Sequence, residues 1–232
     1  MATYTTPGAL LEALERPEIR HAFRLSFLTA TVTAILSVWF AVPIGYVLAR
    51  YEFRGKAFID GVLDVPIVLP PMVIGLSLLI LFQTGPGQWI ESFLPVTYEV
   101  PSVVLAQFAV ACAFAVRTMR VTFDGIDPRR EQVAWTLGCS RRQAFWTVVM
   151  PEAGRGALTA GMLAWARALG EFGPILVFSG ATRMKTEVLP STVFLELSTG
   201  DLGAAVAVSL ILVTAALAVL ILARTLGLRL SR

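Results

Sequence analysis

Long apolar stretches alternate with short polar ones along this chain. The first stretch, residues 25–49, contains no charged residue and is long enough to cross a hydrocarbon layer of about 30 Å as a helix. Four further stretches have the length and apolar character of membrane-spanning helices. The pattern predicts an all-α membrane protein with five spanning helices, over residues 25–49, 61–82, 101–116, 157–178 and 202–223.

The longest polar segment is the loop over residues 117–156, between the third and fourth predicted spans. Within it, a short helix is predicted over 131–137, and Gly138 is placed to end that helix in a left-handed turn. Three residues of this helix are expected to share one face, namely Val133, Ala134 and Leu137.

A second helix is predicted to follow the turn. Ser140 is placed to cap it, and it is expected to run through Trp146 and to end before Pro151. Because Arg141 and Arg142 open this helix, the segment also resembles a DNA-reading helix-turn-helix. The run is too short for the three-helix core of such a domain and predicted spans hold both its ends, so we expect no nucleic-acid partner.

The second predicted span contains a proline pair that a straight helix does not tolerate. Pro70 and Pro71 remove backbone donors and clash with the preceding turn. A half-helix starting near Pro71 would aim its positive N-terminal end toward the membrane centre, which suits an anion. The alternative is a proline kink that only shapes packing. Both interpretations remain open.

The fourth predicted span carries two charges, Arg167 and Glu171, at i, i+4 spacing. Charged residues in a span are costly and normally point inward. One interpretation is an ion pair that locks this helix against its neighbours. The other is that Arg167 lines an anion path, with Gly170, Gly173 and Pro174 as the flexing point.

Composition and charge agree with this architecture. The chain is 56% hydrophobic and 15% charged, with a mean hydropathy of +0.73, which is typical of a membrane protein. Of the 19 lysine and arginine residues, thirteen fall on the side of the polar loop, five on the other side and Arg167 within a span. The positive-inside rule then places the loop and the tail at 224–232 in the cytoplasm, and the segment 1–24 outside.

The sequence offers no chemistry of its own. The two cysteines, Cys112 and Cys139, are not placed to pair, and no cysteine–histidine cluster could hold a metal. There is no phosphate-binding G-x4-G-K-[ST] loop and no nucleophile–base pair. We therefore expect neither an enzyme nor a cofactor-binding chain, and any ATP and magnesium would bind to a partner subunit.

The polar loop resembles a known signature. Gly138, followed after nine residues by Val148, Met150 and Pro151, resembles the G-x9-I-x-L-P pattern of the EAA loop in type I ABC-importer membrane subunits. In that family the loop is the coupling helix, which sits in a groove of the cytoplasmic ATPase. The resemblance implies that the five predicted spans form the core of a type I importer transmembrane domain.

The match departs from the family pattern at its first position. The E-A-A positions hold Gln132, Val133 and Ala134, whereas Glu131 lies one place earlier. By resemblance, Ala134, Leu137 and Gly138 would form the small contact face. The ATPase-coupling residues implied by the resemblance are Glu131, Gln132, Val133, Ala134, Leu137, Gly138, Ser140 and Arg141.

Other stretches resemble the molybdate, tungstate and sulfate branch of this family. These are VLPPMVIG at 68–75, ARALGEFGP at 166–174 and the segment 186–210. The resemblance implies import of a tetrahedral oxyanion, tungstate or molybdate first and sulfate second, across a prokaryotic inner membrane. It also implies a homodimer of this subunit, two ATPase subunits and an external binding protein. The translocation path would include Pro70, Pro71, Arg167, Gly170, Glu171 and Gly173.

Two other readings stay open at this point. A self-contained anion channel or secondary transporter would need no ATPase, but it should carry charges in several spans, and it leaves the arginine-rich loop without a role. The loop could also be a solvated connection with no docking function. A membrane enzyme is the weakest alternative because no catalytic constellation is visible.

Overall fold

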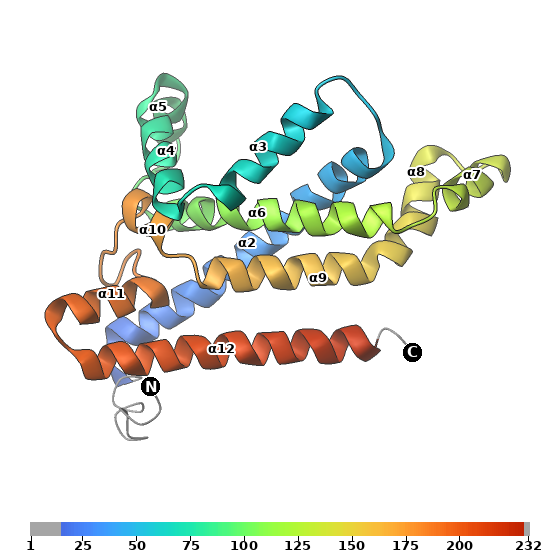
Figure 1. Cartoon of the computed structure of the whole chain (residues 1–232). Helices are drawn as coiled ribbons and strands as arrows, with labels where there is room; N and C mark the ends of the chain where they lie inside the picture. The colour runs from blue at the N-terminus through green and yellow to red at the C-terminus, as the bar shows by residue number, and fades with distance from the viewer. Residues whose placement is uncertain (1–14, 230–232) are drawn as a thin grey trace.

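The computed structural model describes residues 15–229, with side chains described up to residue 221 apart from residue 220. The expected terminal segments 1–24 and 224–232 therefore lie partly outside the described residues. Within the described range every regular element is a helix (Figure 1). In chain order these are α2 (Pro17–Arg50), α3 (Lys56–Val68), α4 (Pro71–Gln83), α5 (Gly85–Glu91), α6 (Val100–Asp124), α7 (Arg129–Thr136), α8 (Arg141–Ala144), a π-helical turn (Phe145–Val149), α9 (Met150–Leu169), α10 (Gly173–Phe178), α11 (Leu189–Thr199) and α12 (Leu202–Arg229).

The expectation of five continuous spans is confirmed only in part. Among the described residues, α2, α6 and residues 202–219 of α12 are each long and apolar enough to cross a membrane. The second predicted span is two helices, α3 and α4, bent by 114° (Figure 1). The fourth is divided between α9 and α10, and α9 is less apolar because it carries Glu152, Arg155 and Arg167.

The first spanning helix begins earlier than predicted. Helix α2 starts at Pro17, inside the segment that the charge pattern placed before the span. Ile19 is buried against Leu189 of α11 and Val208 of α12, which the sequence pattern did not reveal. The start of α2 is therefore part of the folded core.

Small side chains hold the central helices together. Helices α2, α6 and α9 pack on one another, and a Cβ added to Gly45 of α2 would lie 2.9 Å from the backbone nitrogen of Arg120. Lipid tails are as apolar as side chains, so close van der Waals contact takes the place of a hydrophobic driving force between spans. The buried alanines that allow this approach are Ala30, Ala34, Ala41, Ala111, Ala115, Ala160 and Ala164.

Two further glycine contacts join α4 to α10. A Cβ added to Gly75 would lie 2.7 Å from the Cα atom of Pro174, and one added to Gly173 would lie 3.1 Å from the backbone nitrogen of Met72. The two short helices therefore cross in direct backbone contact. Each begins with a proline in its first turn.

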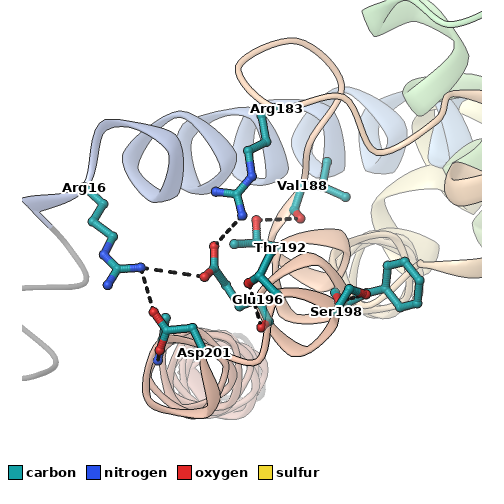
Figure 2. Close-up of polar contacts among 10 residues, drawn as sticks. Arg16, Arg183, Val188, Thr192, Glu196, Ser198 and Asp201 are labelled. Carbon is teal, nitrogen blue, oxygen red and sulfur yellow. Dashed lines mark hydrogen bonds and ion pairs between the residues drawn. The ribbon is translucent and has the colours of Figure 1, made fainter.

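An ion cluster ties the start of α2 to α11 and α12, at the end of the bundle opposite α7 and α8 (Figures 1 and 2). The Glu196 carboxylate, which is buried, lies 2.8 Å from the Arg183 guanidinium and 3.6 Å from that of Arg16. Arg16 also donates a 3.1 Å hydrogen bond to Asp201 (Figure 2). This cluster connects three segments that are distant in sequence.

Glu187 lies near this cluster and is fully buried. Its two carboxylate oxygens have no hydrogen-bond partner among the described residues. Burial is the largest effect on this group, and it raises the pKa of Glu187 above the ordinary value of 4.5. The folded chain therefore favours the protonated form.

Replacing Glu187 with glutamine should stabilise the folded chain at neutral pH. Stability from a group with a raised pKa is fully present below the unfolded value, near 4.5, and is lost as pH rises through the folded value. Glu187→Gln should therefore raise the thermal midpoint in detergent at pH 7 and flatten its decline above pH 4.5. The exposed Glu52→Gln is the control. Equal pH profiles for both variants would contradict this account.

Replacing Gly75 with alanine should destabilise the crossing of α4 and α10. The added methyl group meets the backbone of Pro174, which cannot rotate away, so we expect a loss of about 1–3 kcal/mol in the free energy of unfolding. Gly154→Ala in α9 is the matched control, since its Cβ has no neighbour within 4 Å and alanine favours the helix. Thermal unfolding in detergent measures both, and an equal midpoint for the two variants would refute the close contact.

Candidate functional site

The turn between α7 and α8 has the geometry that the sequence predicted. Gly138 is left-handed, with φ +94°. The Cys139 N–H donates to the Ala134 carbonyl, and the Gly138 N–H donates to the Trp135 carbonyl, both at 3.0 Å. These are the two bonds of a Schellman motif, so the end of α7 is fixed by its own backbone.

The second helix starts as predicted but ends differently. Ser140 caps α8 through a capping box, because its hydroxyl accepts from the Gln143 N–H while the Gln143 side chain accepts from the Ser140 N–H. The prediction that this helix stops before Pro151 is wrong. A π-helical turn, in which the Met150 N–H bonds to the Phe145 carbonyl, accommodates Pro151 within the start of α9.

Helix α7 has two distinct faces. Glu131 and Ala134 point into the protein, with Glu131 only 3% exposed. Val133 and Leu137 point outward and are 57% and 80% exposed. The expectation that Ala134 shares a face with these two residues is therefore wrong, because Ala134 follows the inward side at i, i+3 from Glu131.

The remaining predicted coupling residues lie at the surface beside this outer face. Gln132, Ser140 and Arg141 are exposed, and the Arg141 guanidinium lies 5.6 Å from the centre of the Trp135 ring. Gln132 and Arg141 also border a small pocket of about 180 Å³, together with the inward Glu131 and with Tyr46 and Arg50 of α2. The structure thus brings Gln132 and Arg141 together with the buried Glu131 at this pocket, whereas Val133 and Leu137 lie on the exposed face of α7.

The inward Glu131 is held by two residues of α2 that the sequence did not single out. Arg50 Nε donates to its carboxylate at 2.8 Å, and the Tyr46 hydroxyl donates to the other oxygen at 2.6 Å. The partners are 81 and 85 positions away, so no local spacing reveals them. The available signal was Arg50 itself, the first basic residue after the uncharged stretch 25–49.

Charge pairs also join α3 to α6 near this end of the bundle. Arg117 is paired with Asp64, and Arg120 with Asp60. The signal for these pairs was present in the sequence as two aspartates at i, i+4 in α3 and two arginines at i, i+3 in α6. The charge count used these arginines only to predict which side of the membrane they lie on.

The proline pair breaks the second span as predicted. Leu69 and Pro70 are extended, with ψ values of 145° and 131°, and α4 starts at Pro71. Pro70 and Pro71 are exposed on the described chain. The break is a change of direction between two helices rather than a simple kink.

The second break follows Arg167. Its guanidinium lies 2.6 Å from the Glu171 carboxylate, which confirms the predicted i, i+4 pair. The two partners differ in exposure, since the Glu171 side chain is 2% exposed and that of Arg167 is 31% exposed. Helix α9 ends at Leu169, and α10 begins at Gly173.

The structure brings the two breaks into contact. A Cβ added to Gly173 would lie 3.1 Å from the Pro71 Cβ. Behind them, Gln107 of α6 donates to the Ala168 carbonyl at 3.1 Å and accepts from the Thr33 hydroxyl of α2 at 3.1 Å. Buried side-chain bonds therefore fix the end of α9 where its own ladder stops.

Across the described residues there is no group of three or more histidine, cysteine, aspartate or glutamate side chains arranged to hold a metal ion. Cys112 and Cys139 are both free thiols. The arrangement instead offers an exposed apolar face on α7, with Val133 and Leu137, and a charged, broken region where α4 and α10 meet.

Relatives with assigned roles match nearly the whole chain. The sulfate transport system permease protein CysT of Escherichia coli is 33% identical over 224 residues, covering 95% of this chain and 81% of that one. The molybdate/tungstate transport system permease protein WtpB of Pyrococcus furiosus is 36% identical over 92% of this chain and 82% of its own. A probable molybdenum ABC transporter permease protein of Haloferax volcanii is 37% identical over 96% and 81%.

Solved structures share the fold. A bacterial ABC transporter involved in the import of alginate aligns with a TM-score of 0.75 at 13% identity, over 97% of this chain and 84% of that one. The alginate transporter bound to a pentasaccharide-loaded periplasmic protein aligns with a TM-score of 0.76, over 99% and 85%. At this identity the likeness concerns the fold alone.

The model of one protein family matches residues 41–232, from the last third of α2 through both breaks, the α7–α8 turn and α12. This range holds all the predicted site residues. The chain therefore belongs to the family of binding-protein-dependent transport system inner membrane components.

Proposed function

We propose that this chain is the membrane-spanning permease subunit of an ATP-driven importer of a tetrahedral oxyanion, tungstate or molybdate first and sulfate second. The observation that carries the proposal is the similarity over 92–96% of the chain to permeases named for molybdate, tungstate and sulfate. The fold, with its exposed α7 and its two helix breaks, supports the same role.

The proposed assembly has two copies of this chain, two ATPase subunits on the cytoplasmic side and a binding protein outside. ATP and magnesium bind to the ATPase subunits, and this chain binds no cofactor. In this proposal α7, α8 and the C-terminus lie in the cytoplasm of a prokaryotic cell and the start of α2 lies outside the membrane, which the charge asymmetry supports.

Helix α3 supports the pairing of two copies. None of its residues is buried within one chain, and Val62, Val65 and Val68 are exposed on a helix that also contacts α6 through its aspartates. An apolar helix of this kind in the middle of a permease faces either lipid or a second subunit. In the proposed assembly of two copies, we assign this uncovered apolar face of α3 to the second copy.

In this proposal the outer face of α7 sits in the ATPase groove. Val133 and Leu137 supply the apolar contact, and Gly138 keeps the turn low enough for close docking. Ser140 and Arg141 border the same surface. When ATP closes the ATPase dimer, the two α7 helices approach each other and the pathway changes from inward to outward facing.

The proposed anion path passes the meeting point of α4 and α10. Arg167 is partly exposed there, and Glu171 holds it in place by its 2.6 Å contact. The partial neutralisation lets a dianion pass without being trapped, since conduction requires weak binding along the path. Pro70, Pro71, Gly170 and Gly173 allow the backbone to move at this level.

Replacing Leu137 with aspartate should release the ATPase. An exposed leucine buried in a groove contributes about 1.5–3 kcal/mol, so ATPase co-purifying with the permease should fall at least about tenfold. Leu202→Asp, at an exposed leucine on the opposite end of the bundle, is the control and should retain the ATPase. Full retention of the ATPase by Leu137→Asp would show that this face of α7 does not contact the ATPase.

The transported anion should reveal itself through ATP hydrolysis. We expect the reconstituted complex to hydrolyse ATP faster when its binding protein is loaded with molybdate or tungstate, and less so with sulfate. ATPase assays with the three loaded forms and the empty form measure this. Anion flux that proceeds without ATP would instead favour a self-contained channel or secondary transporter.

A further inference from the structure

Glu131 is the acidic residue of the coupling helix, yet it is turned away from the face that a partner could reach. Its side chain is 4% exposed and that of Arg50 is 9% exposed. Both carboxylate oxygens are used inside the chain, one by Arg50 and one by Tyr46. Each oxygen of Glu131 is therefore engaged inside the chain, and the side chain is almost wholly covered.

The same contacts tie the coupling helix to the elements before and after it. Arg50 also donates to the Ile126 carbonyl at 2.8 Å, at the turn that leads into α7. The Tyr46 ring lies edge-on to Phe123, near the end of α6, and to Phe145 of the π-helical turn. The inner end of α2 therefore holds both ends of the loop and its first helix.

A buried charge pair of this kind is sensitive to the loss of one partner. Removing either Glu131 or Arg50 leaves an uncompensated charge in a poorly hydrated site, whereas replacing both leaves none. By contrast, the neighbouring residue Arg130 pairs with Glu152 of α9 at 2.7 Å but is 60% exposed on its side chain. Exposed pairs contribute little.

We propose that Glu131 is a positioning residue that latches the coupling helix to α2, so that α7 and α2 move as one body. The inference rests on the proposed coupling function. Helix α2 has 34 residues and so spans about 50 Å. Just before its outer end, Arg16 contacts Glu196 and Asp201 of the outer ion cluster (Figure 2). The latch therefore connects the ATPase side to the opposite face of the membrane.

The test compares docking with coupling in the complete complex, with ATPase and binding protein, in proteoliposomes. The variants are Glu131→Gln, Arg50→Gln and the double variant. Arg130→Gln with Glu152→Gln is the matched exposed pair. Two quantities are measured: the ATPase that co-purifies, and the molybdate or sulfate transported per ATP hydrolysed.

Both single variants should retain the ATPase within about twofold and lower the transport-to-hydrolysis ratio about fivefold or more. The double variant should recover a substantial part of that ratio, because two amides can bond to each other without a buried charge. The exposed pair should behave as the unmodified chain. A structural defect alone would lower the amount of complex without lowering this ratio.

Three results would overturn the inference. Loss of the ATPase in Glu131→Gln but not in Arg50→Gln would make Glu131 a docking residue. An unchanged transport-to-hydrolysis ratio in both single variants would contradict the latch. Additive losses of this ratio in the double variant would contradict it as well. If a glutamine variant does not accumulate, Tyr46→Phe, which deletes one hydrogen bond to Glu131, replaces it in the test. A lower transport-to-hydrolysis ratio in Tyr46→Phe would support the latch, and an unchanged ratio would contradict it. A complex that never retains an ATPase, even unmodified, would instead refute the proposed function.

Discussion

Close contact between small residues is the constraint on which this structure depends. Inside a bilayer, spans gain nothing from leaving lipid unless their surfaces fit closely. Alanines on α2, α6 and α9 provide that fit, and Gly45 lets α2 approach the backbone of α6. These three helices form a frame against which the broken elements are held. The crossing of α4 and α10 repeats the principle, with Gly75 and Gly173 in place of the alanines.

Charges gather at the two ends of this frame and at the breaks between them. At the end that carries α7 and α8, Arg50 bonds Glu131, and two arginines of α6 bond two aspartates of α3. At the opposite end, two arginines converge on Glu196 (Figure 2). Between them, the breaks carry the pair of Arg167 with Glu171. Ion pairs at the ends join elements that are distant in sequence, while the pair at the break lies on the anion path that we propose.

Features set by neighbouring residues could be predicted from the sequence, and features set by distant contacts could not. Gly138 and Ser140 fix their turns through bonds within a few positions, and Arg167 meets Glu171 one turn away, so all three predictions are confirmed. The inward direction of Glu131 depends on a partner 81 positions earlier, which periodicity does not show. The prediction of a helix end before Pro151 was wrong because a π-helical turn accommodates the proline, and residue propensities do not reveal such a turn.

The central claim is that α7 presents one face to the ATPase and holds α2 with the other. A structure of the whole complex, determined with and without ATP, tests it most directly. The account predicts Val133 and Leu137 against the ATPase in both states, with the Arg50–Glu131 contact intact as α2 and α7 shift together. A structure in which Glu131 leaves Arg50 to bond an ATPase side chain would contradict it.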